Sequence, residues 1–266
     1  MDIAVRPLAG RSALVTGSTG GLGLALADGL AAAGCDVVLT GLAEPDEAER
    51  IVEEVRLRHG VRALFRRADL AHPAEIEALI RHVDEEFDGI DILVNNAVVR
   101  QFGPIERMEV AGWDRSIAVN LTAAFHLVRL TLPGMRARDF GRIVNVSSIY
   151  GLIGTTDRAD YVTTKTALIG LTRAVALETA ESGITCNAIC PGTVPTDAIT
   201  AKIRGIAAER GISEPAATRD YLANRQPTRR FVATDGVVST TVFLCGPGAR
   251  DITGATLPID GAWSAM

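Results

Sequence analysis

The chain has 266 residues, of which 47% are hydrophobic and 22% are charged, a composition that allows a large core and excludes a disordered protein or a coiled coil. A formal net charge of -5, without any basic run, argues against nucleic acid as a partner, although it leaves room for a local basic pocket. The cysteines are scattered and lack ligand-type spacing, so we expect reduced, buried thiols at Cys35, Cys186, Cys190 and Cys245.

The sequence lacks the patterns of a targeting segment and of a metal site. Residues 1–10 lack the apolar core of a signal peptide, and no stretch of membrane-spanning length is free of charge. These features predict a cytoplasmic protein with no membrane partner. The histidines show no paired ligand spacing, so the sequence predicts no metal site at His59, His72, His82 or His126.

Short apolar runs rich in β-branched residues alternate with longer segments of helical periodicity. The predicted strands span residues 12–16, 36–40, 62–66, 90–94, 142–146, 185–189 and 256–259. The predicted helices span residues 22–33, 44–59, 73–87, 114–138, 161–182 and 235–245. Continuously apolar strands separated by helices are typical of a parallel sheet covered on both faces. The sequence therefore predicts an α/β fold, a doubly wound Rossmann-type sheet in a single domain over residues 1–266.

The alternation breaks over residues 196–224. Two short helical patterns, 197–209 and 215–224, follow one another there without a strand between them. A long insertion near the carboxyl edge of an open sheet is where a small helical lid over the substrate would lie. The alternative is a helical decoration that covers apolar surface.

Glycines gather between the first predicted strand and the first helix, in Thr16-Gly17-Ser18-Thr19-Gly20-Gly21-Leu22-Gly23. They allow a tight turn and let the backbone approach a pyrophosphate, which the helix N-terminus stabilises. The spacing is not the common G-x-G-x-x-G, but its place between strand and helix indicates a dinucleotide site. We expect cofactor contacts from Gly17, Thr19, Gly21, Leu22 and Gly23.

The end of the second strand often decides between NAD and NADP, because a carboxylate there binds the ribose 2′-hydroxyl. Here it reads Leu39-Thr40-Gly41-Leu42, and no Lys or Arg occurs from Gly17 to Glu49. A 2′-phosphate would lack an obvious cationic partner, so we expect NAD as the cofactor. Asp69, after the third strand, is expected to accept from the adenine amino group, the alternative being a helix N-cap.

Tyr161 and Lys165 are spaced i, i+4 on a predicted helix and so project from one face. A tyrosine hydroxyl has a pKa of about 10, and a neighbouring ammonium favours its ionised form for proton exchange with an alcohol or carbonyl oxygen. Ser148, at a strand end, could hold the substrate oxygen. Asn120, inside the predicted helix 114–138, could kink it and anchor a water that links Lys165 to solvent. Alone such a pair is usually a surface coincidence, but the glycine loop favours catalysis.

The glycine loop, Asn95-Asn96-Ala97, Asn120, Ser148, Tyr161-x-x-x-Lys165 and Pro191-Gly192 together resemble the short-chain dehydrogenase/reductase family. The resemblance implies that Tyr161 is the catalytic acid/base and that Lys165 binds the nicotinamide ribose. It further implies that Ser148 positions the substrate and that Asn120 completes a proton relay. The other residues that we expect to contact the cofactor are Leu42, Leu70, Asn96, Ala97, Pro191 and Val194. Val98 departs from the family's glycine, and since a β-branched residue disfavours positive φ, the nearby backbone is expected to differ slightly.

A narrower resemblance, over most of the chain, is to the bacterial D-3-hydroxybutyrate dehydrogenases, on segments such as 38–41, 176–180 and 183–192. That group is NAD-dependent, cytoplasmic and tetrameric, so the resemblance implies a homotetramer. Its substrate contacts are Gln, His, Lys, Trp and Gln, which correspond here to Arg100, Tyr150, Arg158, Thr193 and Lys202. Neutral drift explains any one of these changes, but five together indicate altered specificity.

The sequence therefore predicts an NAD-dependent enzyme that transfers a hydride between the nicotinamide and a secondary alcohol or ketone. The expected substrate is a small anion, a hydroxy acid of the 3-hydroxybutyrate type or a bulkier relative. One alternative is a dehydrogenase or reductase of a neutral polyol or cyclic alcohol. Another is a non-catalytic NAD(H)-binding protein, which the presence of both Tyr161 and Lys165 disfavours.

Overall fold

Within residues 6–266, the part of the chain that this computed structural model describes, seven parallel strands form one sheet in the order β3-β2-β1-β4-β5-β6-β7. The strands are β1 (Ser12–Thr16), β2 (Asp36–Gly41), β3 (Ala63–Arg67), β4 (Ile92–Asn95), β5 (Gly141–Val146), β6 (Ile184–Pro191) and β7 (Thr256–Ile259). Every predicted strand is confirmed, with boundaries that shift by one or two residues at most. The prediction of a doubly wound, Rossmann-type α/β fold is therefore confirmed.

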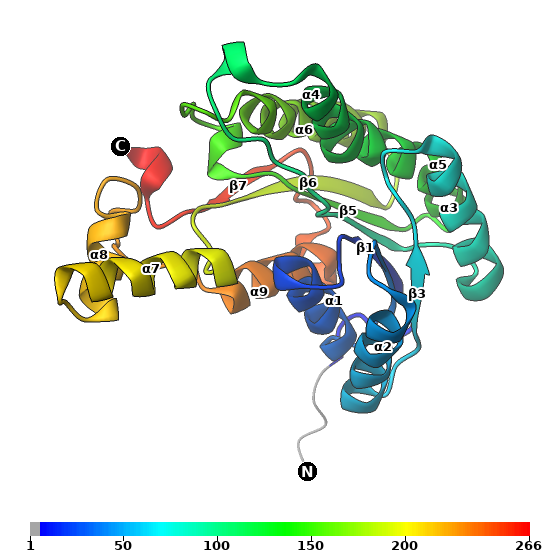
Figure 1. The fold of residues 1–266 in the computed structure, drawn as a ribbon. Helices are drawn as coiled ribbons and strands as arrows, with labels where there is room; N and C mark the ends of the chain where they lie inside the picture. Colours follow the sequence, from blue (N-terminus) through cyan, green and yellow to red (C-terminus); the bar gives the residue numbers. More distant parts are fainter. Residues whose placement is uncertain (1–5) are drawn as a thin grey trace.

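Helices cover both faces of the sheet (Figure 1). One face carries α1 (Gly21–Ala32), α2 (Pro45–His59) and α9 (Thr234–Cys245), and the other carries α3 (Pro73–Phe87), α5 (Ala123–Ala137) and α6 (Ala159–Glu178). Successive side chains of a strand point to opposite faces, so Val15 joins the core on the α1 side and Leu14 the core on the α5 side. Burial on both faces explains why the strands are continuously apolar. The four cysteines are buried and free, as expected.

The helix predicted over 114–138 is interrupted. α4 (Val110–Ile117) is followed by a π-helical turn, η2 (Ala118–Thr122), and only then by α5. The helix also begins four residues before the expected start. A π turn is a local break in the α-helical hydrogen-bond register and often marks a functional site. The sequence analysis expected Asn120 to kink the helix, and the structure has a π-helical turn at this residue.

The stretch Val110–Ala137 is long and apolar enough, by length and composition alone, to cross a membrane. In the structure α5 packs on β4, β5 and α3, while α4 packs on α6. These contacts place the apolar side of the stretch in the protein core. In its most apolar 18-residue window, 39% is buried inside the protein.

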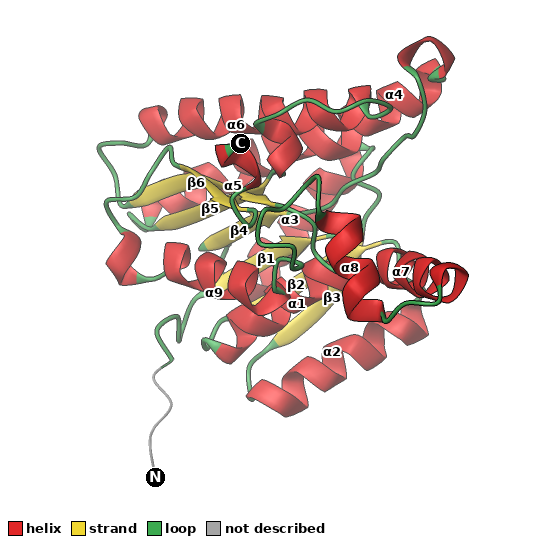
Figure 2. Ribbon diagram, turned by 90° about the vertical axis from the view of Figure 1, so that its left-hand side faces the viewer, coloured by secondary structure: helices red, strands yellow, loops and turns green. Residues whose placement is uncertain are grey.

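The two helices predicted within 196–224 are α7 (Asp197–Arg210) and α8 (Glu214–Leu222). The Thr196 side chain accepts from Ile199 N and the Ser213 side chain from Ala216 N, so hydroxyl N-caps begin both helices. The helices pack on each other through a small apolar cluster of their own, and they project beyond the sheet in Figures 1 and 2. We call α7, α8 and the turn that follows to Arg225 the lid segment.

Candidate active site

A cavity of about 870 Å³ runs along the carboxyl ends of the strands, from the glycine loop after β1 to the lid segment. It lies at the point where strand order reverses, between β1 and β4, which is where open α/β sheets bind ligands. Its lining includes every residue expected to bind cofactor or substrate: Gly17, Thr19, Gly21, Leu22, Gly23, Leu42, Asp69, Leu70, Asn96, Ala97, Arg100, Ser148, Tyr150, Arg158, Tyr161, Lys165, Pro191, Thr193, Val194 and Lys202. Their proximity is a finding, while their individual roles stay predictions.

The glycine loop fits a pyrophosphate. Gly17 and Gly21 have positive φ values of 61° and 53°, conformations that other residues rarely adopt. A Cβ on Gly23 would lie 2.0 Å from the Gly17 carbonyl oxygen and 2.5 Å from Asn96 Nδ2, so only glycine lets the first turn of α1 approach the loop. That turn has neither a side-chain cap nor an acidic residue, which leaves its N–H groups open to an anion.

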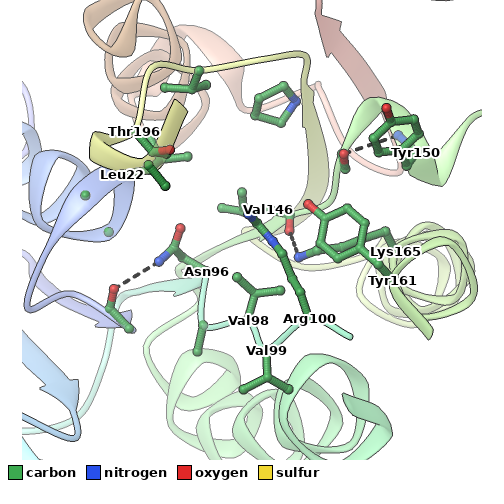
Figure 3. Close-up of a pocket in the computed structure, with 18 of the residues that line it drawn as sticks. Leu22, Asn96, Val98, Val99, Arg100, Val146, Tyr150, Tyr161, Lys165 and Thr196 are labelled. Atoms are coloured by element: carbon green, nitrogen blue, oxygen red, sulfur yellow. Dashed lines mark hydrogen bonds between the residues drawn. The ribbon is translucent and has the colours of Figure 1, made fainter. Parts of the chain in front are cut away.

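Asn96 braces this loop from the adjacent strand end. Its Nδ2 donates to the carbonyl oxygens of Thr16 (2.9 Å) and Gly17 (3.2 Å), as Figure 3 shows in part. The hydroxyl of Thr16 in turn accepts from the backbone N–H groups of Asn96 and Ala97. Val98, the departure from the family motif, does not have a positive φ, so its β-branched side chain fits the backbone as it is built.

At the far end of the cavity, Asp69 is an ion-pair partner rather than a helix cap. The N-cap of α3 is His72, so the N-cap alternative is wrong. Asp69 accepts from Ala71 N (3.0 Å) and, through both oxygens, from Arg115 Nη2 (3.3 and 3.2 Å). Burial raises the pKa of Asp69, but the hydrogen bond from Ala71 and the Arg115 guanidinium together hold it below its ordinary value. Its expected contact with adenine stays a prediction.

Two cations that the sequence argument for NAD did not consider, Arg67 and Arg115, lie near the end of β2. The sheet register pairs Gly41 with Arg67 of β3, whose side chain is exposed and lies outside the cavity lining. Arg115 does line the cavity, but it is engaged with Asp69. Both lie outside the Gly17–Glu49 range in which the sequence offers no cation, and only strand pairing and helix packing bring them to this place.

Tyr161 and Lys165 meet on one face of α6, beside β5 (Figure 3). The Lys165 Nζ donates to the Val146 carbonyl oxygen at 2.6 Å and lies 5.7 Å from the centre of the Tyr161 ring. Lys165 is only 2% exposed. Burial, and after it the positive charge of Arg100, lowers the pKa of Lys165 from 10.5 to about 7. Near neutral pH this amine can therefore gain or lose a proton.

Ser148 follows β5 and begins the short helical turn η3 (Ile149–Gly151). Its Oγ accepts from Tyr150 N at 3.2 Å, which leaves the hydroxyl proton available to a ligand oxygen. Tyr150 stacks edge-on against both Tyr161 (6.4 Å between ring centres) and Trp263 (5.4 Å). Trp263 thus joins the site from the C-terminal turn, where Asp260 accepts from the N–H groups of Ala262 and Ser264.

Asn120 is the one predicted catalytic residue outside the cavity lining. Its Oδ1 accepts from Val99 N (2.8 Å), and its Nδ2 donates to the Val99 carbonyl oxygen (2.9 Å) and to Thr164 Oγ1 (3.2 Å). Both amide protons are used, but Oδ1 keeps a second lone pair that can accept from a water, and the expected proton relay through Asn120 stays a prediction. The contacts tie the segment that carries Arg100 to α6.

The predicted substrate cations point to one end of the cavity. Arg100 lies over the Tyr161 ring, 5.1 Å from its centre, and extends into the cavity between Val146 and Tyr161 (Figure 3). Arg158, the N-cap residue of α6, stacks on Phe102 at 4.1 Å. Lys202 reaches the cavity from α7 and lies 5.3 Å from the Tyr221 ring.

Sequence reasoning missed several other lining residues, of which the largest side chains include Phe102, Tyr221, Arg225 and Trp263. Tyr221 and Arg225 share the i, i+4 spacing of Tyr161 and Lys165, which is the only local signal that could have paired them. Nothing local indicates that Trp263, near the end of the chain, reaches the site. Among the described residues, no group of three His, Cys, Asp or Glu could hold a metal ion.

Comparisons with known proteins agree with this geometry. A family model described as short chain dehydrogenase matches residues 11–205. D-beta-hydroxybutyrate dehydrogenase of Cupriavidus necator is 42% identical over 259 residues, covering 97% of this chain and 100% of that protein. A 3-oxoacyl-(acyl-carrier-protein) reductase of Staphylococcus epidermidis is 34% identical over 251 residues, covering 94% and 98%. The structure of L-sorbose reductase from Gluconobacter frateurii, complexed with NADPH and L-sorbose, matches with a TM-score of 0.90 at 29% identity, covering 97% and 98%. Both resemblances drawn from the sequence are confirmed.

Proposed function

Because this chain belongs to the short-chain dehydrogenase/reductase family, we propose that it is an NAD-dependent oxidoreductase of a small hydroxy acid. The reaction converts a secondary alcohol to a ketone or the reverse, on a substrate of the 3-hydroxybutyrate type or a bulkier anionic relative. The observation that carries this proposal is the convergence of Tyr161, Lys165, Ser148 and Arg100 on one cavity. They combine a proton-exchanging hydroxyl, a cation beside it, a hydrogen-bond donor and a cation for a carboxylate.

The residues present fit a dinucleotide. The glycine loop and the open first turn of α1 would hold the pyrophosphate, and Asn96, Ala97, Pro191 and Val194 would flank the nicotinamide half. When bound, the nicotinamide supplies the hydride chemistry that protein side chains cannot provide.

The side chains then manage the substrate and its proton. In alcohol oxidation Tyr161 accepts the hydroxyl proton, while the free Ser148 proton holds the substrate oxygen. In its protonated form Lys165, whose Nζ lies 5.7 Å from the ring centre, stabilises negative charge that develops on Tyr161 during proton transfer. Arg100, over the same ring, pairs with the substrate carboxylate through its planar guanidinium. Tyr150 and Trp263 form an apolar wall that limits water on one side.

NAD rather than NADP is proposed on the composition of the adenosine end. No Lys or Arg occurs from Gly17 to Glu49, and Arg115 is already paired with Asp69. The L-sorbose reductase that resembles this chain is complexed with NADPH, so the choice needs direct measurement. Comparable kcat/KM values with NAD and NADP would refute it.

Assembly and location are proposed from the resemblance to the hydroxybutyrate dehydrogenases: a cytoplasmic homotetramer. Light scattering on the purified protein tests the assembly, since about four times 28.1 kDa is expected. Fractionation of cells that express the full chain tests the location.

The decisive test is a substrate screen with NAD and NADP, followed by absorbance of the reduced nicotinamide. Hydroxy acids of increasing length and charge are compared with neutral polyols and cyclic alcohols. The neutral class is a real competitor because the L-sorbose reductase fold matches this chain closely. A neutral polyol that turns over fastest would favour that alternative, and Arg100→Gln should then leave kcat/KM unchanged. For a hydroxy acid, Arg100→Gln should raise KM roughly 10-fold or more, the value of a lost charged hydrogen bond.

A further inference from the structure

The cations of the lid segment differ in their ion pairs and in whether they line the cavity. Arg204 pairs with Glu214 and Arg210 pairs with Asp220, and neither arginine lines the cavity. Lys202 and Arg225 do line the cavity, and neither forms an ion pair with any residue within 6–266. Arg219, the fifth cation of the segment, also forms no ion pair within residues 6–266, but it lies outside the cavity lining. Lys202 and Arg225 are therefore the cations of this segment that line the ligand space.

Both unpaired cations rest against one aromatic ring. The Lys202 ammonium lies 5.3 Å and the Arg225 guanidinium 4.5 Å from the centre of the Tyr221 ring. The Arg225 Nη1 also donates to the Tyr221 hydroxyl at 2.7 Å. Because this hydroxyl already accepts a bond, its own proton is free to be donated. The cluster thus offers an anion a guanidinium, an ammonium and a hydroxyl.

The cluster has a fixed scaffold. Tyr221 packs on the apolar cluster of the lid segment, which is centred on Ile203, Ala207 and Ala217. Arg225 N donates to the Leu222 carbonyl oxygen at 3.0 Å, so it lies one turn beyond the end of α8. The next residue, Gln226, is fully buried, and its side chain accepts from Thr193 N and donates to the Arg230 carbonyl oxygen. Arg225 is therefore held beside the cavity wall that contains Thr193.

Two cations that lie against one ring repel each other, although water screens part of that repulsion because Lys202 is exposed. A bound anion would offset this cost, and a bidentate guanidinium suits a carboxylate. Arg100 and Arg158 already supply cations to the same cavity from other elements, beside Tyr161 and at the start of α6. One cavity thus carries two separate groups of cations on different elements.

We propose that Tyr221, Arg225 and Lys202 form a second anion-binding subsite, and that the substrate is a hydroxy dicarboxylate whose distal carboxylate binds there. This inference rests on the proposed function, since it assigns the first carboxylate to the Arg100 side. It names residues of the lid segment that set the substrate class, and it explains why Arg225 lines the cavity without a carboxylate partner among the described residues.

The test compares two six-carbon acids, 3-hydroxyadipate and 3-hydroxyhexanoate, which differ only in a terminal carboxylate or methyl group. The wild-type protein should favour 3-hydroxyadipate in kcat/KM by roughly 10-fold or more, and Arg225→Met should reduce this preference by roughly 10- to 100-fold. Arg225→Lys should retain part of it, and Tyr221→Phe, which keeps the ring, should lose a smaller share. Arg210→Met is the matched control, since it removes a lid cation that is exposed and lies outside the cavity, and it should leave the preference unchanged.

Binding is measured separately from turnover, by calorimetry of both acids with Tyr161→Phe protein saturated with NAD. Tighter binding of 3-hydroxyadipate that is lost in Tyr161→Phe/Arg225→Met supports the subsite, even if neither acid is turned over by the wild type. If the wild type turned over neither acid, only the proposed hydroxy acid activity would be overturned. Equal kcat/KM values of the wild type for the two acids would overturn the inference. Turnover of both acids would at the same time support the proposed hydroxy acid activity. An Arg225→Met protein that loses NAD affinity instead of diacid preference would also overturn it, by assigning these cations to the cofactor.

Discussion

Replacing Lys165 with methionine should change how the stability of the cofactor-free protein depends on pH. Lys165 is 2% exposed, donates to the Val146 carbonyl oxygen and faces the positive charge of Arg100. Its pKa is lowered to about 7, mainly by burial, whereas in the unfolded chain it returns to 10.5. Folding therefore disfavours the charged form of this amine.

The sign of the effect follows from proton binding. Between pH 7 and pH 10.5 the unfolded chain holds more protons at Lys165 than the folded one, so the free energy of unfolding rises with pH in that window. Around pH 8 the folded amine is mostly neutral, which gives a slope of about 1 kcal/mol per pH unit. Below the folded pKa both states are protonated and the residue adds no slope, but its charge then costs the fold about 5 kcal/mol.

Denaturant unfolding of the wild type and Lys165→Met at pH 7.5 and pH 8.5 measures this slope. The wild type should gain about 1 kcal/mol more than the variant between the two values. Burial raises the pKa of Cys35, Cys186 and Cys245, which gives an opposite slope at higher pH, but both proteins share it and the difference cancels. The matched control is Lys202→Met, an exposed lysine, which should follow the wild type. Parallel profiles for wild type and Lys165→Met would show that the buried amine does not titrate as argued.

Three further changes probe the site. Tyr161→Phe should lower kcat by roughly 10²- to 10⁴-fold while the NAD dissociation constant changes little, because it removes only the exchangeable proton; activity within a few-fold of wild type would refute its role. Leu42→Arg, at a half-exposed cavity residue, should raise kcat/KM for NADP relative to NAD by about 10-fold, and an unchanged ratio would place the 2′-hydroxyl elsewhere. Gly23→Ala should destabilise the fold by about 1–3 kcal/mol in urea unfolding, because its Cβ would lie 2.0 Å from the Gly17 oxygen, whereas Gly170→Ala, in open space, should not.

The sequence could predict the features that depend on residues close together in the chain. Short runs rich in apolar residues marked all seven strands, and the central strands are the most continuously apolar because both of their faces are buried. The position of the glycines between β1 and α1 marked the anion site, because only glycine fits at Gly23. The i, i+4 spacing of Tyr161 and Lys165 placed them together, because a helix holds that geometry wherever it packs.

The features that it could not predict depend on contacts between distant segments. Asn120 disturbs its helix as expected, but its amide is taken up by Val99 and Thr164, which only tertiary packing brings within reach. Trp263 joins the site because the turn at Asp260 directs the last residues back to Tyr150. The position of Arg225 at the cavity depends on how α8 packs on α7, which the periodicity of the sequence does not predict.

The charge of the cavity, more than the fold, separates the competing substrates. The chain has 27 Lys and Arg against 32 Asp and Glu, yet within residues 6–266 the cavity lining has one carboxylate, Asp69, and six cations: Arg100, Arg115, Arg158, Lys165, Lys202 and Arg225. Arg115 neutralises Asp69, so the excess positive charge lies at the substrate end. A cleft with one sign of charge focuses its field and speeds the association of anions. A neutral polyol would gain nothing from that field and would offer these cations no opposite charge. The same fold can serve either substrate class, so the electrostatics of this cavity are the stronger argument for a hydroxy acid.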